Sequence, residues 1–323
     1  MDSFEAVDVH THVVPIDLVP PSDDERWPIA VELGDVAELR TSTGRRRVIP
    51  ATAWNLDRRL LDMENHGVST QVLSPLPELF AYWAEPGEAA EWCRGVNDWT
   101  AKAMATHPDS FDGLGILPMQ DPEAAARVLD EVADGPLCGI ALGTNVAGVP
   151  LTDPRFAEIF RLAAALDLCV FVHAVPGVHT AAVARRLGDP ALAVAATFPG
   201  EIASVGLGLL AANRDVRSCP RIALSHCGGG MPLLTGRLAG MRGEATDTQR
   251  FWYDSLAHDD DLLDAVAHRG GAARILAGSD YPSALPDWPD QVARASAVNA
   301  AAFLGSRSRL HRRLHVKRHS GTA

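Results

Sequence analysis

Four strand-like segments of this chain, three of them apolar runs, each end in a histidine or an aspartate, and this pattern constrains the fold more than any other feature of the sequence. The segments are Phe4–His12, Leu168–His173, Arg221–His226 and Ile275–Asp280. Short apolar runs predict buried strands, and side chains two residues apart on a strand point to the same face. His10 and His12 can therefore bind one metal ion together. Because the other segments end in two histidines and an aspartate, the pattern predicts one shared polar site.

The alternation of strand-like and helix-like segments favours a parallel sheet covered by helices. The expected strands lie near residues 5–9, 70–74, 111–116, 139–142, 169–172, 221–225, 251–253 and 274–277. The expected helices cover residues 56–66, 88–107, 122–133, 154–167, 232–241, 260–269 and 290–304. A barrel of strand–helix units needs about 250 residues, which a chain of 323 residues can supply. The sequence therefore predicts an α/β fold, a (β/α)8 TIM barrel.

We expect one barrel domain over residues 1–305, with two long connections and a short tail. Residues 13–55 form an insertion after the first strand, and residues 174–212 lengthen the connection after the fifth. Both connections leave the carboxyl ends of strands, where such barrels build their active sites, so they are candidates for a lid and for substrate walls. Residues 306–323 interleave basic residues with histidines. That pattern is typical of a solvated or partly disordered terminus, and the alternative is a contact with an anion or a partner.

The composition excludes several classes of function. The net charge of -12 argues against a nucleic-acid partner, which would need a basic face. The 5 cysteines are scattered and include no Cys-x-x-Cys pair, so we expect reduced thiols. We expect no apolar stretch of the roughly 18 residues that a membrane span needs, and no secretory signal at the start. The expected protein is cytoplasmic and acts on a small-molecule substrate, with neither a membrane nor nucleic acid as a partner.

The histidines and the aspartate at the strand ends predict a metal site. Three neutral imidazoles and a carboxylate suit Zn²⁺ first, and Fe²⁺, Co²⁺ or Mn²⁺ are the alternatives. We assign His10, His12, His173 and Asp280 as ligands, and Asp280 also has a part in the chemistry. A fourth imidazole would crowd the ion, whereas a free one titrates in a useful range. His226 is therefore expected to act as a general acid or base, and the alternative is a structural core histidine.

Further motifs indicate a family. They are Asp8–His12, Ala81–Ala84, Gly113–Gln120, Phe171–His173, Ser225–Gly229 and Gly278–Pro282. With these motifs in this order, the chain resembles the amidohydrolase superfamily from Val7 to Gly305, in the branch of 2-amino-3-carboxymuconate-6-semialdehyde decarboxylase and related non-oxidative decarboxylases. The resemblance implies a barrel of the metal-dependent hydrolase type, one zinc ion, and His226 as the acid or base. It also implies a homodimer in which Arg237 of one subunit reaches the substrate carboxylate of the other, and Trp83 of the second motif is expected to contact substrate.

The lysine content bears on the number of metal ions. Related hydrolase barrels with two metals bridge them with a carboxylated lysine from the fourth strand. Here that strand ends in Gly139–Asn145, and the lysines of the chain are Lys102 and Lys317, on an expected helix and in the tail. We therefore expect one metal ion per chain.

Several positions depart from the pattern that the resemblance implies. An arginine that binds the substrate carboxylate in the muconate-semialdehyde enzyme is replaced by Pro50, and Arg47 or its neighbours at residues 45 and 46 are the candidates to substitute for it. The alternative is that these three arginines are solvated on a polar loop. A Pro-Trp pair after the fifth-strand histidine is replaced by Ala174 and Val175, and a later tryptophan by Val194. The metal chemistry is thus retained, and a changed substrate is expected.

Two classes of enzyme fit these residues. The first is a lyase that removes CO₂ from a carboxylated aromatic or muconate-like substrate. The second hydrolyses an aromatic ester or amide, or closes a ring such as a benzoxazole. A protein that binds metal without turnover is a third reading, which the presence of His226 and Asp280 disfavours.

Overall fold

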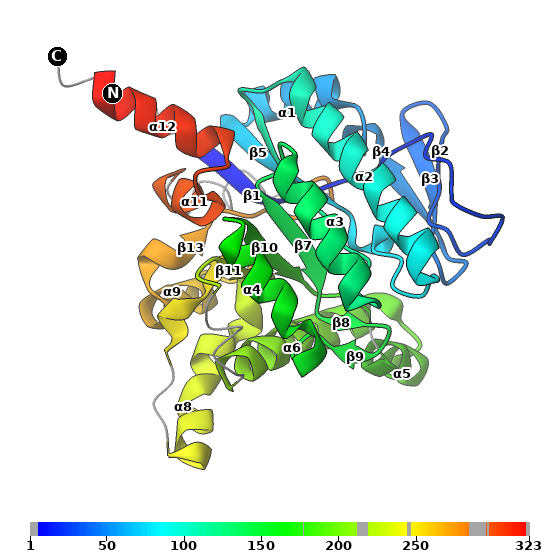
Figure 1. The fold of residues 1–323 in the computed structure, drawn as a ribbon. Coiled ribbons are helices and arrows are strands. Elements are labelled where there is room, and N and C mark those ends of the chain that lie inside the picture. The colour runs from blue at the N-terminus through cyan, green and yellow to red at the C-terminus, as the bar shows by residue number, and fades with distance from the viewer. Residues whose placement is uncertain are drawn as a thin grey trace.

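The computed structural model describes residues 6–176, 178–211, 219–243, 247–283, 295 and 297–320, and these residues form a (β/α)8 barrel (Figure 1). The strands follow in the order β1 (Ala6–Val13), β5 (Val68–Pro75), β6 (Phe111–Gly115), β7 (Gly139–Gly143), β10 (Cys169–His173), β11 (Ile222–Leu224), β12 (Trp252–Asp254) and β13 (Ile275–Leu276). Each adjacent pair in this order is parallel. The predicted fold class is confirmed.

The barrel closes where the last strand meets the first. The Val9 N–H donates to the carbonyl of Ala277 at 2.9 Å, and Thr11 forms a parallel bridge with Tyr281. The strands are buried on both faces, and all five residues of β10 are buried. This burial explains the nearly continuous apolar runs of β7, β10 and β11.

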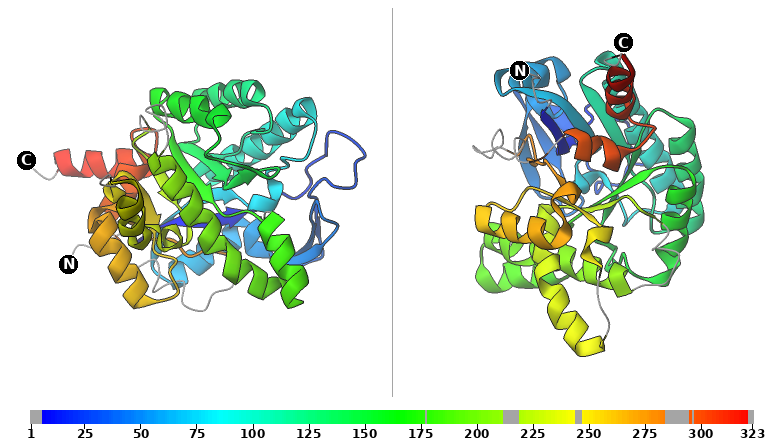
Figure 2. Two further views of the ribbon diagram at one scale, coloured as in Figure 1. Left: turned by 90° about the horizontal axis from the view of Figure 1, so that it is seen from below. Right: turned by 90° about the vertical axis from the view of Figure 1, so that its left-hand side faces the viewer.

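Helices cover the outside of the barrel (Figures 1 and 2). They include α1 (Leu56–Asn65), α2 (Pro86–Thr106), α3 (Pro122–Asp134), α4 (Ala157–Ala165), α8 (Met231–Arg242), α9 (Asp260–Gly270) and α11 (Ala297–Leu304). The start of α3 illustrates the local signals, because the Asp121 side chain accepts from the N–H groups of Glu123 and Ala124 at 3.0 and 3.2 Å. Of the helix expected over residues 290–304, residues 290–294 and 296 lie outside the described part of the chain.

The insertion after β1 contains a small antiparallel sheet that the sequence analysis did not predict. Its strands are β2 (Ala30–Glu32), β3 (Val36–Arg40) and β4 (Arg46–Pro50). Leu39 is fully buried and belongs to the hydrophobic core of the barrel, which attaches the sheet to it. Figures 1 and 2 show the sheet in blue at one side of the molecule. After β7, the chain also forms the short hairpin of β8 (Asn145–Val146) and β9 (Val149–Pro150).

The connection after β10 folds into two helices, α5 (Val178–Leu187) and α6 (Pro190–Ala211). Among the described residues, α6 is the one helix long and apolar enough to cross a membrane, by length and composition alone. The expectation that no apolar stretch reaches that length is therefore wrong. The apolar residues have another use here, because Ile202, Val205 and Leu209 are buried in the core of the barrel.

The C-terminal segment forms α12 (Arg309–Ser320), which packs on the end of the barrel where the strands begin. The buried carboxylate of Asp112 accepts from Ser308 Oγ and from the Arg309 N–H, both at 2.8 Å, and Leu310 is fully buried. Arg313 donates to Thr70 Oγ1 at 2.7 Å. The start of the tail thus differs from the expected solvated terminus, because it satisfies a buried carboxylate.

Candidate metal centre

Three strands of the barrel bring four potential ligands together at their carboxyl ends. His10 and His12 extend from β1, His173 ends β10, and Asp280 follows β13. Their ligand atoms all lie within 4.8 Å of one another. Asp280 Oδ1 lies 2.8 Å from His12 Nε2 and 3.5 Å from His10 Nε2. The structure therefore places all four predicted ligands in one cluster.

Orphaned nitrogen atoms test whether this cluster fits a metal ion. The Nε2 atoms of His10 and His173 are buried without a hydrogen-bond partner. Leaving such an atom unpaired costs about 1–3 kcal/mol, so buried polar atoms normally have partners. A cation bound among these nitrogens would use their lone pairs. Three imidazoles and a carboxylate are also an ordinary donor set for a transition metal, so the residues fit one ion.

Hydrogen bonds at the far side of the rings fix which nitrogen is free. His10 Nδ1 donates to the Asp254 carboxylate at 2.6 Å, and His173 Nδ1 donates to the carbonyl of Ala174 at 2.7 Å. In each ring the proton on Nδ1 leaves the Nε2 lone pair facing the cluster. Bonds of this kind orient metal-binding histidines and strengthen them as ligands.

The protonation states of His12, His173 and Asp280 also suit metal binding. Burial lowers the pKa of both His12 and His173, which favours neutral rings. Burial alone would raise the pKa of Asp280, but its hydrogen bond with His12 and its electrostatic interactions with His12, His10 and His226 in their protonated forms together bring it below its ordinary value. The carboxylate is therefore ionised, as a metal ligand must be.

His226 lies beside the cluster without belonging to it. Its ring centroid is 5.3 Å from that of His10 and 5.1 Å from that of His173, and its Nε2 is buried with no hydrogen-bond partner. Burial lowers the pKa of His226 to about 4, so the ring is neutral at neutral pH. A neutral imidazole with a free nitrogen can accept a proton from a molecule bound at the cluster.

A turn with left-handed backbone geometry places His226 beside the candidate ligands. The five residues His226–Gly230 all have positive φ, between 50° and 72°. The Asp254 carboxylate accepts from the N–H groups of His226 and Cys227 at 2.9 and 2.7 Å, which holds the start of the turn. At Gly229 a Cβ atom would lie 2.0 Å from the carbonyl oxygen of Pro199, so only glycine fits there.

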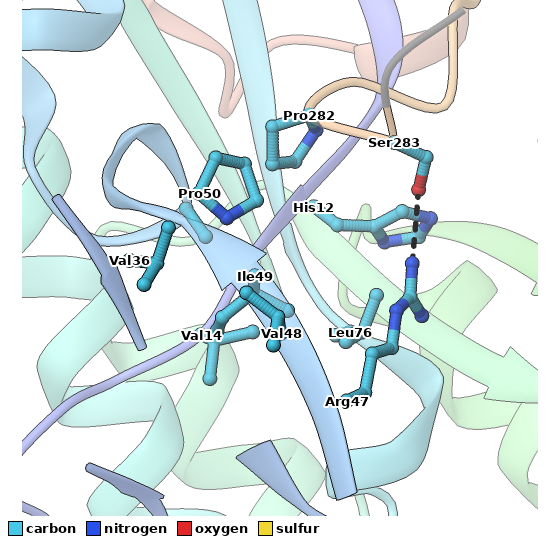
Figure 3. Close-up of a pocket in the computed structure, with 11 residues that line it drawn as sticks. His12, Val14, Val36, Arg47, Val48, Ile49, Pro50, Leu76, Pro282 and Ser283 are labelled. Carbon is cyan, nitrogen blue, oxygen red and sulfur yellow. Dashed lines mark hydrogen bonds between the residues drawn. The ribbon is translucent and has the colours of Figure 1, made fainter. Parts of the chain in front are cut away.

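A cavity of about 330 Å³ opens next to His12. Its lining residues are His12, Val14, Val36, Arg47, Val48, Ile49, Pro50, Ala53, Leu76, Pro282 and Ser283. Figure 3 shows His12, Arg47 and Ser283 at one side of this cavity, with Val36 and Pro50 at the other. Arg47 donates to Glu78 at 3.0 Å and makes a long contact of 3.4 Å with Ser283 Oγ. The volume and the apolar walls suit a small organic ligand.

The other two residues expected to bind substrate, Trp83 and Arg237, do not line this cavity. Trp83 is half-buried, with its ring 4.9 Å from that of Trp27 and under the Arg26 guanidinium, and it does not line this cavity. Arg237 is exposed on α8, a helix that projects from the barrel (Figures 1 and 2). A role for Arg237 across a dimer depends on a second subunit, so it stays a prediction.

The sequence analysis missed Asp254, whose carboxylate accepts hydrogen bonds both from His10 of the candidate ligand cluster and from the backbone of the His226 turn. It is fully buried at the end of β12, where the expected strand stopped at Tyr253. The available signal was the one used for the ligands, because Phe251–Asp254 is another apolar run that ends in a carboxylate.

Comparison with known proteins agrees with this geometry. Residues 7–304 match the family described as Amidohydrolase. The chain belongs to the amidohydrolase family. A curated relative is the 2-amino-3-carboxymuconate-6-semialdehyde decarboxylase of Dictyostelium discoideum, which is 28% identical over 314 residues that cover 86% of this chain and 82% of the relative. The gamma-resorcylate decarboxylase of a Polaromonas species is 28% identical, with 70% of this chain and 76% of the relative covered.

Solved structures share the fold of this chain. One is a dihydroxybenzoic acid decarboxylase from a Polaromonas species with bound manganese and the inhibitor 2-nitroresorcinol. Its TM-score is 0.72 at 21% identity, and the match covers 93% of this chain and 97% of that one. The resemblance inferred from the sequence motifs is thus confirmed.

Proposed function

We propose that this chain catalyses the metal-dependent, non-oxidative decarboxylation of a carboxylated aromatic or muconate-like substrate. The observation that carries the proposal is the position of His226 Nε2, which is buried and unpartnered beside the ligand group but outside it. The relatives named above, which are decarboxylases, support the same choice.

The residues have distinct roles in this proposal. His10, His12, His173 and Asp280 would hold the ion, which when bound supplies a Lewis acid for a substrate oxygen. His226 first accepts a proton at Nε2 from a substrate hydroxyl or a water molecule, and then transfers that proton to the carbon that carries the carboxylate. The bond between that carbon and the carboxylate then breaks, its electron pair stays with the carbon, and CO₂ leaves. Asp254 acts through others, because it fixes the His10 ring and the turn of His226.

One ion per chain, with zinc as the first choice, is part of the proposal. The donor set supports zinc, with iron, cobalt and manganese as the alternatives. A single ion is supported by the end of β7, where Gly143 stands and no lysine is available to bridge a second metal.

Mass spectrometry of the products tests the reaction class. The purified protein, loaded with metal, is incubated with 2,6-dihydroxybenzoate, 5-carboxyvanillate, 6-methylsalicylate and 2-amino-3-carboxymuconate semialdehyde. Loss of CO₂ from any of them supports the lyase. A panel of aromatic esters and amides is run in parallel, and a mass change of one water there, without CO₂ loss in the first panel, favours the hydrolase or cyclase instead.

We also propose a cytoplasmic homodimer. The five cysteines, all free and buried, support a reducing compartment. The exposed apolar side chains of Leu233 and Leu234 on α8, next to Arg237, support a subunit contact at that helix. Size measurement in solution tests the dimer.

A further inference from the structure

Arg47 lines the cavity next to His12, and its positive charge is balanced by the carboxylate of Glu78. Arg47 Nη1 lies 3.0 Å from Glu78 Oε1, and the two side chains are 38% and 28% exposed. Glu78 lies in the short helix Pro77–Leu79, which directly follows the cavity-lining Leu76. Arg47 and Glu78 together therefore bring no net charge to this side of the cavity.

Arg47 still has hydrogen-bonding capacity beyond these contacts. Its guanidinium carries five N–H donors, and the structure gives one contact from Nη1 to Glu78 and one long contact from Nη2 to Ser283. A ligand group in the cavity can accept from Arg47, whose charge is already balanced by Glu78. A phenolic hydroxyl accepts without bringing a charge, whereas a carboxylate adds a second negative charge near Glu78.

The remaining walls of the cavity limit the ligand further. Val14, Ile49, Pro50 and Leu76 are among the apolar residues that surround the space between the polar side and the insertion sheet. Such walls favour a flat apolar ring over a second charged group, because an unpaired charge would lose its hydration there.

We infer that Arg47 and Glu78 act as a paired, charge-neutral subsite that selects aromatic acids with a single carboxylate and a neutral hydroxyl, and discriminates against dicarboxylates. The inference rests on the proposed function, in which the single carboxylate is the group removed at the metal. It distinguishes this chain from an enzyme that takes a carboxymuconate semialdehyde, which is a dicarboxylate. Glu78 is the residue that determines specificity, and Arg47 supplies the donors.

Binding measurements on the metal-loaded protein test the subsite without turnover. Calorimetry compares 3-hydroxybenzoate with isophthalate, and 4-hydroxybenzoate with terephthalate, because each pair differs only in a hydroxyl or a second carboxylate. The wild-type protein should bind the hydroxyl member of at least one pair more tightly. In the Glu78→Gln variant, Arg47 loses its partner, and the ratio of dissociation constants should move toward the dicarboxylate by about fivefold. Adding Arg47→Gln should abolish that gain.

Arg46→Gln is the matched control, because Arg46 lies on the same strand and pairs with Glu38 at 2.9 Å away from the cavity. It removes the same charge and should leave the ratio unchanged. The inference is overturned if Glu78→Gln leaves the ratio as it was, if Arg46→Gln shifts it equally, or if no probe binds. Metal content is measured for every variant, so that loss of the ion is recognised. A shifted ratio in a protein that never releases CO₂ would refute the decarboxylase and retain the subsite, whereas CO₂ release with an unshifted ratio would do the reverse.

Discussion

Replacing Asp254 with asparagine tests whether this carboxylate sets the protonation state of the proposed metal ligand His10. One carboxylate oxygen of Asp254 accepts from His10 Nδ1 at 2.6 Å and from the His226 N–H at 2.9 Å. The other accepts from the N–H groups of Cys227 and Leu256 at 2.7 and 3.2 Å. Asparagine has the same shape but offers an oxygen at one of these positions and an NH₂ group at the other.

The structure predicts which way the amide turns. With its oxygen toward His226, two backbone N–H groups, those of Cys227 and Leu256, would be left without an acceptor. With its oxygen toward Cys227, only the His226 N–H is orphaned, because the His10 ring can shift its proton and accept from the NH₂ group. The second arrangement costs one unsatisfied donor, about 1–3 kcal/mol of the free energy of unfolding. It also puts a proton on His10 Nε2, so metal affinity should fall by about 10- to 100-fold.

Two measurements on the Asp254→Asn variant check this reasoning. Urea unfolding of the metal-free protein gives the stability, and competition with a chelating indicator gives the metal affinity. Asp112→Asn is the control, because Asp112 is equally buried and accepts from the Arg309 and Leu310 N–H groups at the opposite end of the barrel. It should lose stability and keep its metal affinity. If Asp254→Asn also keeps wild-type metal affinity, the carboxylate is structural only and the argument from the His10 proton is wrong.

Three further predictions concern the centre and its neighbours. The purified protein should carry about one transition-metal ion per chain by metal analysis, and alanine at any one of the four ligands should lower that occupancy; two ions per chain would contradict the single site. His226→Ala should keep most of the metal and lose at least about 100-fold in turnover rate, and a variant that loses both would make His226 a ligand. Mixed dimers of inactive Arg237→Ala and inactive His226→Ala chains should regain activity from one intact site, and mixed dimers without activity would exclude a role for Arg237 across the interface.

The clustering of the four candidate ligands could be predicted from the sequence because each residue depends on one local pattern. His173 and Asp280 come at or just after buried strands, and in a barrel the carboxyl ends of all strands meet at one rim. His10 and His12 add the alternation of a single strand. No contact between distant segments had to be known to place these four residues together.

Arg47 and Asp254 show where such patterns are insufficient. Three consecutive arginines precede Val48, and only the strand register decides which one faces the cavity. Arg46 and Arg47 pair with neighbouring residues of β3 and so point to opposite faces, one toward Glu38 and the other toward Glu78. Apart from the nearby Leu256 N–H, the partners of Asp254 come from β1 and from a left-handed turn, and no local pattern near residue 254 predicts either contact.

The position of α12 has a practical consequence for handling the protein. Arg309 and Arg313 donate hydrogen bonds to side chains near the amino ends of β6 and β5. The candidate metal ligands lie at the opposite, carboxyl ends of the strands. Figure 1 shows the helix, in red, extending away from the barrel. A fluorescent reporter or a bead linker fused beyond Ser320 should therefore leave the route of substrate to the ion open, so the enzyme can be immobilised through this end and reused.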